Sequence, residues 1–446
     1  MHIILLSGGS GKRLWPLSND VRSKQFIKIF KKPEALQENG AKDGYESMIQ
    51  RVYRQIRMVD HEASVTVATG KSQVSAIRNQ IGGEADICVE PCRRDTFPAI
   101  ALASAYLHDV KGIPGEEAVV VCPVDPYVNS DYFAALKQLW ELAQKGTANL
   151  VLMGIKPTYP SEKYGYIIPV TEEAVSEVSA FKEKPDAATA QTYIDRGGLW
   201  NGGVFAFKLS YMLEQAHRLL AFTDYADLFS RYDTLGKISF DYAVAEHEPD
   251  IAVMRFNGEW KDLGTWNTLT EAMEESTVGD VRMDDTCRNV HVINELGIPV
   301  LAMGLKDTVI SASPEGILVS DKERSSYLKP FAEAIDRQIM FAEKSWGSFR
   351  VMDVEEDSMT VKVTLNPGHR MNYHSHERRD EVWTVISGRG RTIVDGMEQP
   401  VKAGDVITMQ AGCKHTVIAD TALQLIEVQL GKDISVSDKH KHELTE

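Results

Sequence analysis

Two acidic side chains, far apart in the chain, stand where carboxylates could share a cation. Asp125 ends the valine-rich run Ala118-Val-Val-Val-Cys-Pro-Val-Asp125, so we expect its carboxylate at the carboxyl end of a buried strand. Asp262 lies between two tryptophans in Trp260-Lys-Asp-Leu-Gly-Thr-Trp266. Mg²⁺ prefers one or two carboxylates plus phosphate oxygens, and this pair could supply the carboxylates. Taken singly, Asp125 could instead cap a following helix, and Asp262 could be a turn residue.

A glycine-rich loop, Ser7-Gly-Gly-Ser-Gly-Lys-Arg13, follows the first predicted strand directly. Glycines let backbone N–H groups approach a phosphate chain that bulkier residues would hold away. The loop is therefore a candidate nucleotide cradle. It has neither the Gly-Lys-Ser/Thr of a P-loop nor the dinucleotide fingerprint, and a tight structural turn stays an alternative.

Three cations, Arg13, Arg22 and Lys24, lie close to this loop in an otherwise acidic chain. The chain has 49 Lys and Arg against 64 Asp and Glu, a formal charge of −15, which disfavours a general binder of nucleic acid or anionic membranes. A local basic group suits a triphosphate, because arginine offers a planar fork and lysine a point charge. The alternative is a solvated basic face.

The first 157 residues contain the elements that must position these groups. Short β-branched runs predict strands at Ile3–Leu6, Ser64–Ala68, Ile87–Glu90, Ala118–Val121 and Leu150–Gly154. Apolar residues recur at helical spacing in 49–56, 99–107 and 133–142. This alternation predicts an open, wound α/β sheet. Ligands bind beyond the carboxyl ends of such strands, so chemistry is expected in the loops after Leu6 and Val121.

The remainder of the chain predicts two further kinds of structure. Residues 158–275 are read as a continuation of the first domain, 1–275. Short β runs with turns predict a short β-helix-like linker at 281–330. A linking helix is expected over 328–342. From Trp346 the chain is strand and glycine turn, which predicts a β barrel in a C-terminal domain, 343–446.

Several strings together resemble a known family. Leu6-Ser-Gly-Gly-Ser-Gly-Lys-Arg-Leu-Trp-Pro-Leu-Ser18, with Ser23-Lys-Gln-Phe26, is similar to the signature of sugar-1-phosphate nucleotidyltransferases, in particular mannose-1-phosphate guanylyltransferases. The resemblance continues in order through Glu90-Pro91, Arg94-Asp95-Thr96, Pro123-Val124-Asp125, Tyr164-Gly-Tyr-Ile167, Phe181-Lys-Glu-Lys-Pro-Asp186, Leu199-Trp-Asn-Gly-Gly203, Ser239-Phe-Asp-Tyr-Ala243 and Trp260–Trp266. It implies a Rossmann-like mixed-sheet domain that transfers GMP from GTP to α-D-mannose 1-phosphate with Mg²⁺, giving GDP-mannose and pyrophosphate.

The resemblance also implies roles for individual residues. It assigns catalysis to Arg13, Lys24, Asp125 and Asp262, the two aspartates holding Mg²⁺. It assigns nucleotide binding to Leu6, Gly8, Gly9, Gly11, Glu90, Arg94, Asp95 and Thr96. It assigns sugar-phosphate binding to Gly165, Glu183, Lys184 and Asn201. In this assignment Lys184 contacts the phosphate, and Glu183 and Asn201 bind sugar hydroxyls. Without the resemblance these are ordinary surface charges and a loop asparagine, and Asp95 could equally cap a helix beginning near Thr96.

Two departures leave the substrate open. Ser23 stands where the guanylyltransferases usually carry proline, and Pro126 stands where a histidine commonly follows the aspartate. Transfer of another nucleotide, or transfer to another sugar 1-phosphate, is therefore the alternative within the same reaction class.

A histidine cluster near the C-terminus fits the first cupin motif. Gly368, His374, His376, Glu381 and Gly388 match G-x5-H-x-H-x4-E-x6-G. His374 and His376 alternate on a strand and face the same way, so with Glu381 and His415 they could form an inward-facing site for a divalent metal such as Zn²⁺. The alternative is a surface cluster. The second cupin motif departs at Gln410 and Ala419.

The strings Ser345-Trp-Gly347, Asn366-Pro-Gly368 and Ile426-Glu-Val-Gln-Leu-Gly431 are similar to the cupin domain of bifunctional guanylyltransferase/phosphomannose isomerases. The resemblance makes mannose-6-phosphate isomerase a candidate second activity. Those enzymes carry three consecutive histidines and arginine where this chain has His374-Ser-His-Glu-Arg-Arg379. A non-catalytic dimerisation or sugar-sensing module is one alternative, and an isomerase with a nucleotide-sensing N-terminal half is another.

Cysteine usage and hydropathy bear on the compartment. The five cysteines contain no C-x-x-C pair, which favours a reducing environment. The N-terminus lacks a basic leader, and no stretch reaches the ~18 apolar residues of a membrane span. We expect a cytoplasmic protein, a homo-oligomer such as a dimer, whose partners are GTP and a sugar 1-phosphate rather than nucleic acid or membrane.

Overall fold

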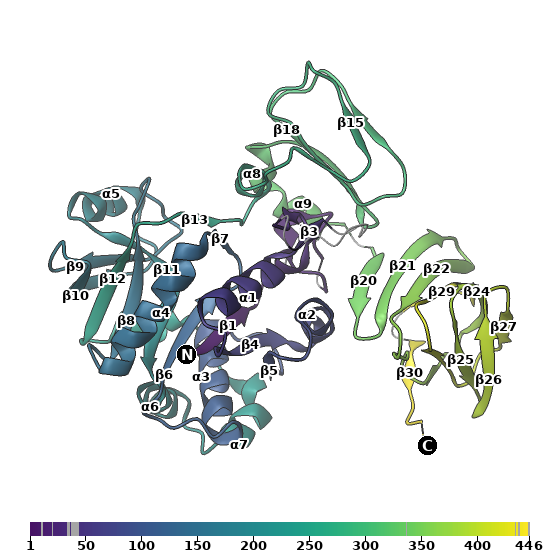
Figure 1. Ribbon diagram of the computed structural model, residues 1–446, viewed down its shortest axis with the longest axis horizontal. Helices are drawn as coiled ribbons and strands as arrows, with labels where there is room; N and C mark the ends of the chain where they lie inside the picture. The colour runs from purple at the N-terminus through teal and green to yellow at the C-terminus, as the bar shows by residue number, and fades with distance from the viewer. Residues whose placement is uncertain are drawn as a thin grey trace. The chain divides into compact units, whose positions relative to one another are not determined.

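The computed structural model describes residues 1–9, 12–19, 21–33, 36, 44–335, 337–432, 434–435 and 438–444 (Figure 1). The chain forms two compact units. The first consists of residues 1–10 and 24–274, and the second of residues 11–23 and 275–446. The short segment 11–23, which contains Arg13 and Arg22, therefore groups with the C-terminal half of the chain.

A nine-stranded mixed sheet forms the first unit, in the order β5-β4-β1-β6-β11-β8-β12-β10-β9. Its strands are β1 (His2–Ser7), β4 (Ser64–Gly70), β5 (Asp86–Glu90), β6 (Ala118–Pro123), β8 (Leu150–Ile155), β9 (Tyr166–Pro169), β10 (Val175–Lys182), β11 (Leu199–Lys208) and β12 (Ile251–Phe256). Strands β5, β4, β1 and β6 run parallel, whereas β11 runs antiparallel to both of its neighbours, β6 and β8. All five strands predicted within the first 157 residues are present, and the mixed α/β fold class is confirmed.

The helices of the first unit lie on the sheet or beside it, as Figure 1 shows. They are α1 (Met48–Val59), α2 (Val74–Ile81), α3 (Thr96–Ala105), α4 (Ser130–Lys145), α5 (Ala187–Asp195), α6 (Leu209–Leu220), α7 (Tyr225–Ser230) and α8 (Trp266–Glu271). Of these, α3, α4 and α6 pack directly on the strands of the sheet. Helix α1 starts at a capping box made by Ser47 and Gln50 and is strongly amphipathic, so one side packs on α4. Helix α3 is apolar on nearly every side and is correspondingly buried between the sheet and α6.

The ends of β1 and β6 bring two predicted functional segments together. Leu6 pairs with Pro123 in the parallel register, and the Val124 N–H donates to the Leu6 carbonyl at 3.2 Å. Because neighbouring parallel strands end at the same edge, the start of the glycine loop and Asp125 lie side by side. Two small sheets complete the unit: β2 (Phe30–Lys31) with β3 (Tyr45–Glu46), and β7 (Pro126–Val128) with β13 (Trp260–Asp262).

The second unit begins with short parallel rungs. They are β14 (Thr277–Val278), β15 (Val281–Met283), β16 (His291–Asn294), β17 (Val300–Ala302), β18 (Thr308–Ser313) and β19 (Gly316–Asp321). Strands β14, β16 and β18 pair in parallel, as do β15 and β17, and β19 closes the series antiparallel to β18. The predicted β-helix-like fold of this region is confirmed.

The helix expected over 328–342 is wrong for most of that range. Helix α9 covers only Lys329–Glu333, with Pro330 in its first turn, and β20 begins at Phe341. The N–H groups of Met340 and Phe341 donate to the Glu315 carboxylate, and β20 pairs with the next strand. These tertiary bonds take the place of the helical ones expected over the rest of that range.

A β barrel forms the C-terminal part of the second unit. One sheet has the order β20 (Phe341–Lys344), β21 (Gly347–Val354), β22 (Ser358–Leu365), β29 (Leu423–Gly431), β24 (Arg379–Ser387) and β27 (Val406–Met409). The other has the order β26 (Met397–Lys402), β25 (Arg389–Val394), β28 (His415–Ala419), β23 (His374–Ser375) and β30 (His440–Lys441). Alternate residues face inward, so Trp383 and Val385 reach the apolar core.

Residues 12–19 and 21–23 are held within the second unit by polar bonds. The Arg22 guanidinium donates to both Glu295 oxygens at 2.7 and 2.8 Å and lies over the Phe341 ring. Asn19 Nδ2 donates to Glu315 at 2.9 Å, and Ser313 Oγ donates to the Pro16 carbonyl. Arg22, which the sequence offered as a phosphate-binding cation, is thus held by a bidentate ion pair.

We expect Glu295→Ala to destabilise this unit. Arg22 keeps only 11% of its side chain exposed, so losing its partner leaves a charge with little water, at a cost of about 2–3 kcal/mol, below the full value for a deeply buried pair. Urea unfolding of the purified chain measures the change. Glu333→Ala is the matched control, because its pair with Lys329 is exposed and should contribute less than about 0.5 kcal/mol. Equal midpoints for the two variants would contradict the expectation.

Candidate active site

The two predicted carboxylates converge in the first unit. Strand β13 pairs antiparallel with β7 so that Asp262 lies opposite Pro126, the residue after Asp125. Lys24 Nζ lies 2.7 Å from Asp125 Oδ2 and 3.6 Å from Asp262 Oδ1. Helix α4 is preceded by Asn129 at its N-cap, so Asp125 does not cap it, and Asp262 ends a strand rather than forming a turn.

This carboxylate pair fits a hard divalent cation. Both side chains are 38–39% exposed, and one ammonium group already lies close to both of them. Burial lowers the pKa of Lys24, but the facing carboxylates of Asp125 and Asp262 outweigh that effect and hold the pKa above its ordinary value. Two carboxylates that meet at an open cavity are the donor set that Mg²⁺ takes, with phosphate oxygens completing its shell.

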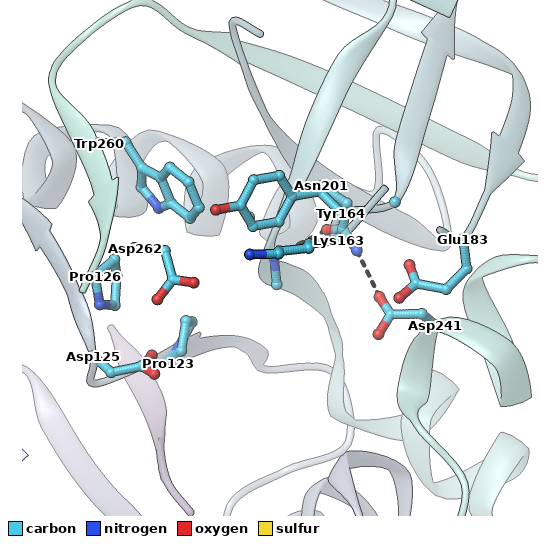
Figure 2. A pocket seen from close by; sticks show the side chains of 13 residues that line it. Pro123, Asp125, Pro126, Lys163, Tyr164, Glu183, Asn201, Asp241, Trp260 and Asp262 are labelled. Carbon is cyan, nitrogen blue, oxygen red and sulfur yellow. Dashed lines mark hydrogen bonds between the residues drawn. The ribbon is translucent and has the colours of Figure 1, made fainter. Parts of the chain in front are cut away.

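A cavity of about 230 Å³ opens beside the pair. Figure 2 shows the side chains around it, and they come from segments far apart in the chain. Asp125 and Asp262 line one end, and Glu183 and Asn201 line the other (Figure 2). Gly165 lies beside these two, and all three were predicted for the sugar phosphate. The structure therefore brings five predicted residues to one hollow.

The sugar end of the cavity has a fixed asparagine. Asn201 Nδ2 donates to Asp241 Oδ1 at 2.6 Å, the dashed line in Figure 2, and Asn201 Oδ1 accepts from the Gly203 N–H at 3.0 Å. Both ends of the amide are thereby oriented. A Cβ at Gly165 would lie 2.5 Å from a Glu183 carboxylate oxygen and 3.3 Å from Asn201 Cβ, so a larger residue there would displace the Glu183 side chain.

Lys184 lies next to this end without lining the cavity. Its Nζ is 2.6 Å from Glu183 Oε1, and its side chain is 50% exposed. Its backbone has φ +45°, a left-handed conformation that is uncommon for a residue other than glycine. The carboxylate of Glu246 accepts the Glu183 N–H at 3.0 Å and helps to hold this bend. Strain of this kind costs on the order of 1–3 kcal/mol and is concentrated at functional sites.

Among the cavity residues that the sequence did not single out, three carry polar groups of interest: Lys163, Asp241 and Trp260. Lys163, whose ammonium points into the cavity in Figure 2, adds a cation, and Asp241 adds an acid. The indole N–H of Trp260 is buried and has no hydrogen-bond partner among the described residues. Asp241 and Trp260 stand inside strings that carried the family resemblance, and Lys163 directly precedes another, so position within those strings was the available signal.

Asp241 predicts a pH dependence of stability. Burial, and then repulsion from Glu183, raise its pKa from 3.8 to about 6, against a smaller opposing effect of Lys184. The native state therefore binds the extra proton between these values, and stability falls as the pH rises through this window and is level above it. Across this window the free energy of unfolding changes by about 3 kcal/mol at most. Asp241→Asn keeps an acceptor for Asn201 and should be more stable than the wild type at pH 7.5 but not at pH 4. Urea midpoints at both pH values test this, and a pH-independent difference would contradict it.

The glycine loop is partly described. Gly8 has open space where a Cβ would lie, and Gly9 has φ +110°, which favours glycine. Gly11 lies outside the described residues. Arg93 Nη2 donates to the Gly9 carbonyl at 3.1 Å, so Arg93 reaches the loop although the sequence pointed to Arg94. Arg13 is exposed on a 3₁₀ turn, Lys12–Leu14, in the second unit.

The other predicted nucleotide-binding residues have structural partners. Glu90 ends β5 and accepts from the Tyr232 hydroxyl at 2.8 Å, and burial raises the pKa of Glu90. Arg94 donates to the Asp233 carbonyl. Asp95 caps α3 by accepting from the Thr96 N–H, as the alternative reading expected. Thr96 Oγ1 accepts from the N–H of Phe240, the residue before Asp241, and so connects this segment to the sugar end of the cavity.

The three cupin histidines also converge. One ring nitrogen from each of His374, His376 and His415 lies within 4.8 Å of the others, and all three side chains are buried. Glu381 approaches His376 at 3.0 Å and His415 at 3.2 Å, while it also binds Arg379 and Trp383. Register explains the arrangement, because His374 pairs with His415 and Glu381 faces inward on β24.

The hydrogen-bond contacts of the three rings suit a transition metal. His374, His376 and His415 each place Nδ1 against a backbone carbonyl, those of Asn372, Asp438 and Cys413, at 2.6, 2.5 and 3.0 Å. An Nδ1–H donated to a backbone carbonyl turns Nε2 toward the cluster, as in metal-ligating histidines. Here His376 Nε2 also lies 3.1 Å from Arg379 Nη2, and His415 Nε2 lies 3.2 Å from Glu381. Burial lowers the pKa of His374, so this ring stays neutral and able to ligate. Three imidazoles suit Zn²⁺ and its neighbours in the first transition row.

Comparison with known proteins agrees with this architecture. The nucleotidyl transferase family matches residues 2–278, and a cupin domain matches residues 361–429. The chain belongs to the nucleotidyl transferase family. None of the helices in the described ranges combines the length and the apolar character needed to cross a membrane.

Individual relatives match over nearly the whole chain. Xanthan biosynthesis protein XanB of Xanthomonas campestris pv. campestris (strain B100) is 29% identical, over 98% of this chain and 96% of the relative. A mannose-1-phosphate guanylyltransferase of Salmonella montevideo is 27% identical, over 98% of each. A crystal structure from Thermus thermophilus, named as a mannose-1-phosphate geranyltransferase, superposes with a TM-score of 0.61 at 26% identity, over 75% of this chain and 99% of that one. The resemblance to mannose-1-phosphate guanylyltransferases is confirmed.

Proposed function

We propose that this enzyme transfers GMP from GTP to α-D-mannose 1-phosphate and releases GDP-mannose and pyrophosphate. The observation that carries the proposal is the meeting of Asp125 and Asp262 beside a 230 Å³ cavity whose other end holds Glu183 and Asn201. Relatives named mannose-1-phosphate guanylyltransferase support the choice of substrates. A phosphate oxygen of the sugar forms a bond to the α-phosphorus of GTP, and the bond from that phosphorus to the bridging oxygen breaks as pyrophosphate leaves.

Positioning and charge neutralisation supply the catalysis, since phosphoryl and nucleotidyl transfers need little covalent help from a protein. We propose that Asp125 and Asp262 hold Mg²⁺, which when bound neutralises developing charge on the phosphates. Lys24 orients the two carboxylates and adds positive charge beside them. Arg13, with the backbone of Leu6, Gly8, Gly9 and Gly11, is proposed to receive the triphosphate.

At the other end of the cavity, Glu183 and Asn201 are proposed to form hydrogen bonds with sugar hydroxyls. Gly165 leaves room for these two side chains. Lys184 is proposed to neutralise the sugar phosphate. Glu90, Arg94, Asp95 and Thr96 are proposed to shape the nucleoside end, where β5 passes into α3.

A substrate panel tests the proposal. Pyrophosphate release is measured with GTP, ATP, UTP and dTTP, each with mannose 1-phosphate and with glucose 1-phosphate. The expected result is a clear preference for GTP with mannose 1-phosphate. A preference for UTP or dTTP would contradict the proposal. It would make the enzyme a transferase of another nucleotide, in keeping with the departures from the family pattern at Ser23 and Pro126.

For the cupin we propose a bound divalent metal such as Zn²⁺, held by His374, His376 and His415 with Glu381 beside them. The buried histidine cluster favours mannose-6-phosphate isomerisation as a second candidate activity. His376→Ala should remove any isomerase activity and spare pyrophosphate release. Loss of both activities in that variant would contradict two independent sites.

A further inference from the structure

The last described residues of the chain run along the ligand-bearing segment of the cupin. We call residues 438–442 the C-terminal strap. Strand β30 of the strap pairs antiparallel with β23, matching Lys441 to His374 and His440 to Ser375. In the order of this sheet β30 lies outside β23 at the edge, so the strap covers the strand that carries a metal-ligand candidate.

Strand β23 has little other support. It is two residues long, and its pairing with β28 is the single register pair His374–His415. The His442 N–H donates to the Tyr373 carbonyl at 2.9 Å, and Ser375 Oγ lies 2.8 Å from His442 Nε2. The strap therefore pairs with both residues of this short strand, whereas β28 pairs with one of them and the Gly412 N–H holds the next residue through the His376 carbonyl.

Asp438 continues these bonds beyond the strand. Its carboxylate accepts the N–H groups of Glu377 and Arg378, each at 3.1 Å, and its side chain is buried. Its backbone carbonyl accepts the His376 Nδ1–H at 2.5 Å. Every residue from Tyr373 to Arg378 is thus paired with or bonded to the strap, including both histidines of the first motif.

We infer that the C-terminal strap is a working part of the cupin metal centre, and that Asp438 is a positioning residue which sets His376 for a divalent metal ion. The inference rests on the metal centre proposed above. A carbonyl that fixes the tautomer of a ligating histidine contributes to metal affinity, typically by about 10-fold or more. Thermodynamic linkage is reciprocal: if the docked strap raises the affinity for the metal, the bound metal must stabilise the docked strap.

Co²⁺ binding to the full-length protein tests the inference. Affinity is measured by titration with visible absorption. The Co²⁺ signal that is lost in His376→Ala is assigned to the cupin site. A chain ending after Ser435 should bind this metal at least about 10-fold more weakly. Asp438→Ala should also weaken binding, and Asp438→Asn, which keeps one acceptor oxygen, should recover part of the loss. Glu443→Ala removes the same charge from an exposed neighbour and should bind like the wild type.

Two further readouts separate positioning from folding. Circular dichroism in EDTA should show that Asp438→Ala keeps the barrel fold, and its pyrophosphate release should be unchanged. Co²⁺ should slow proteolysis of the strap in the wild type more than in Asp438→Ala. Wild-type Co²⁺ affinity in both the shortened chain and Asp438→Ala would overturn the role of the strap and leave the metal centre standing. Absence of any His376-dependent Co²⁺ in the wild type would overturn the metal centre and the strap's role together.

Discussion

Asp262→Ala and Asp125→Ala will each reduce pyrophosphate release by on the order of 1,000-fold at saturating substrates. Each variant removes one of two carboxylates that share a cation beside the cavity. A positioned metal contributes several kcal/mol of charge stabilisation, and each 1.36 kcal/mol is a factor of ten in rate. The expected loss therefore falls mainly on kcat.

The variants should fold, because Asp125 and Asp262 are partly exposed and their replacement by alanine leaves no buried cavity. Glu141→Ala, an exposed acid on α4, is the control for loss of one negative charge and should keep full activity. EDTA should likewise abolish the activity of the wild type without unfolding the first unit, since Lys24 already lies between the carboxylates. Activity within about ten-fold of the wild type in both aspartate variants would exclude the shared-cation site.

Lys184→Asn will lower kcat/KM for the sugar phosphate by about 100-fold and leave the KM for GTP nearly unchanged. A charged hydrogen bond to phosphate contributes ~1.5–3 kcal/mol, which corresponds to this factor. Asparagine is the chosen replacement because it tolerates the left-handed backbone at φ +45°, so the variant removes the charge without adding strain.

Lys182→Asn is the matched control, since Lys182 is two residues away and pairs with Glu246 outside the cavity lining. It should change kcat/KM by less than about three-fold. If Lys184→Asn raised the KM for GTP as much as the KM for the sugar phosphate, Lys184 would belong to the nucleotide rather than to the sugar end.

The buried strands and the chemistry at their ends could be predicted from local sequence. Strand β6 is a run of β-branched residues buried on both faces, and such a run has few alternatives. Its carboxyl end placed Asp125 beside the glycine loop. The position of Asp262 beside Asp125 depends on the pairing of β7 with β13. These strands are about 135 residues apart, and no local sequence pattern specifies their pairing.

Other features depend on tertiary contacts alone. Asp241 is an ordinary acid in the sequence, and its raised pKa comes from burial and from Glu183, nearly 60 positions earlier. Arg22 looked like a phosphate ligand because its partner, Glu295, is remote in the chain. The helix expected over 328–342 gave way to bonds with Glu315. The C-terminal strap carries no periodic pattern, because backbone bonds and one buried carboxylate fix it.

Phosphorus NMR of a mixture of the enzyme, GTP, mannose 1-phosphate and Mg²⁺ tests the central claim most directly. The predicted result is the loss of both substrate signals with equal growth of pyrophosphate and a sugar nucleoside diphosphate, and no change in EDTA or with Asp262→Ala. Release of inorganic phosphate without a sugar nucleotide, or persistence of both substrates in the presence of Mg²⁺, would contradict it.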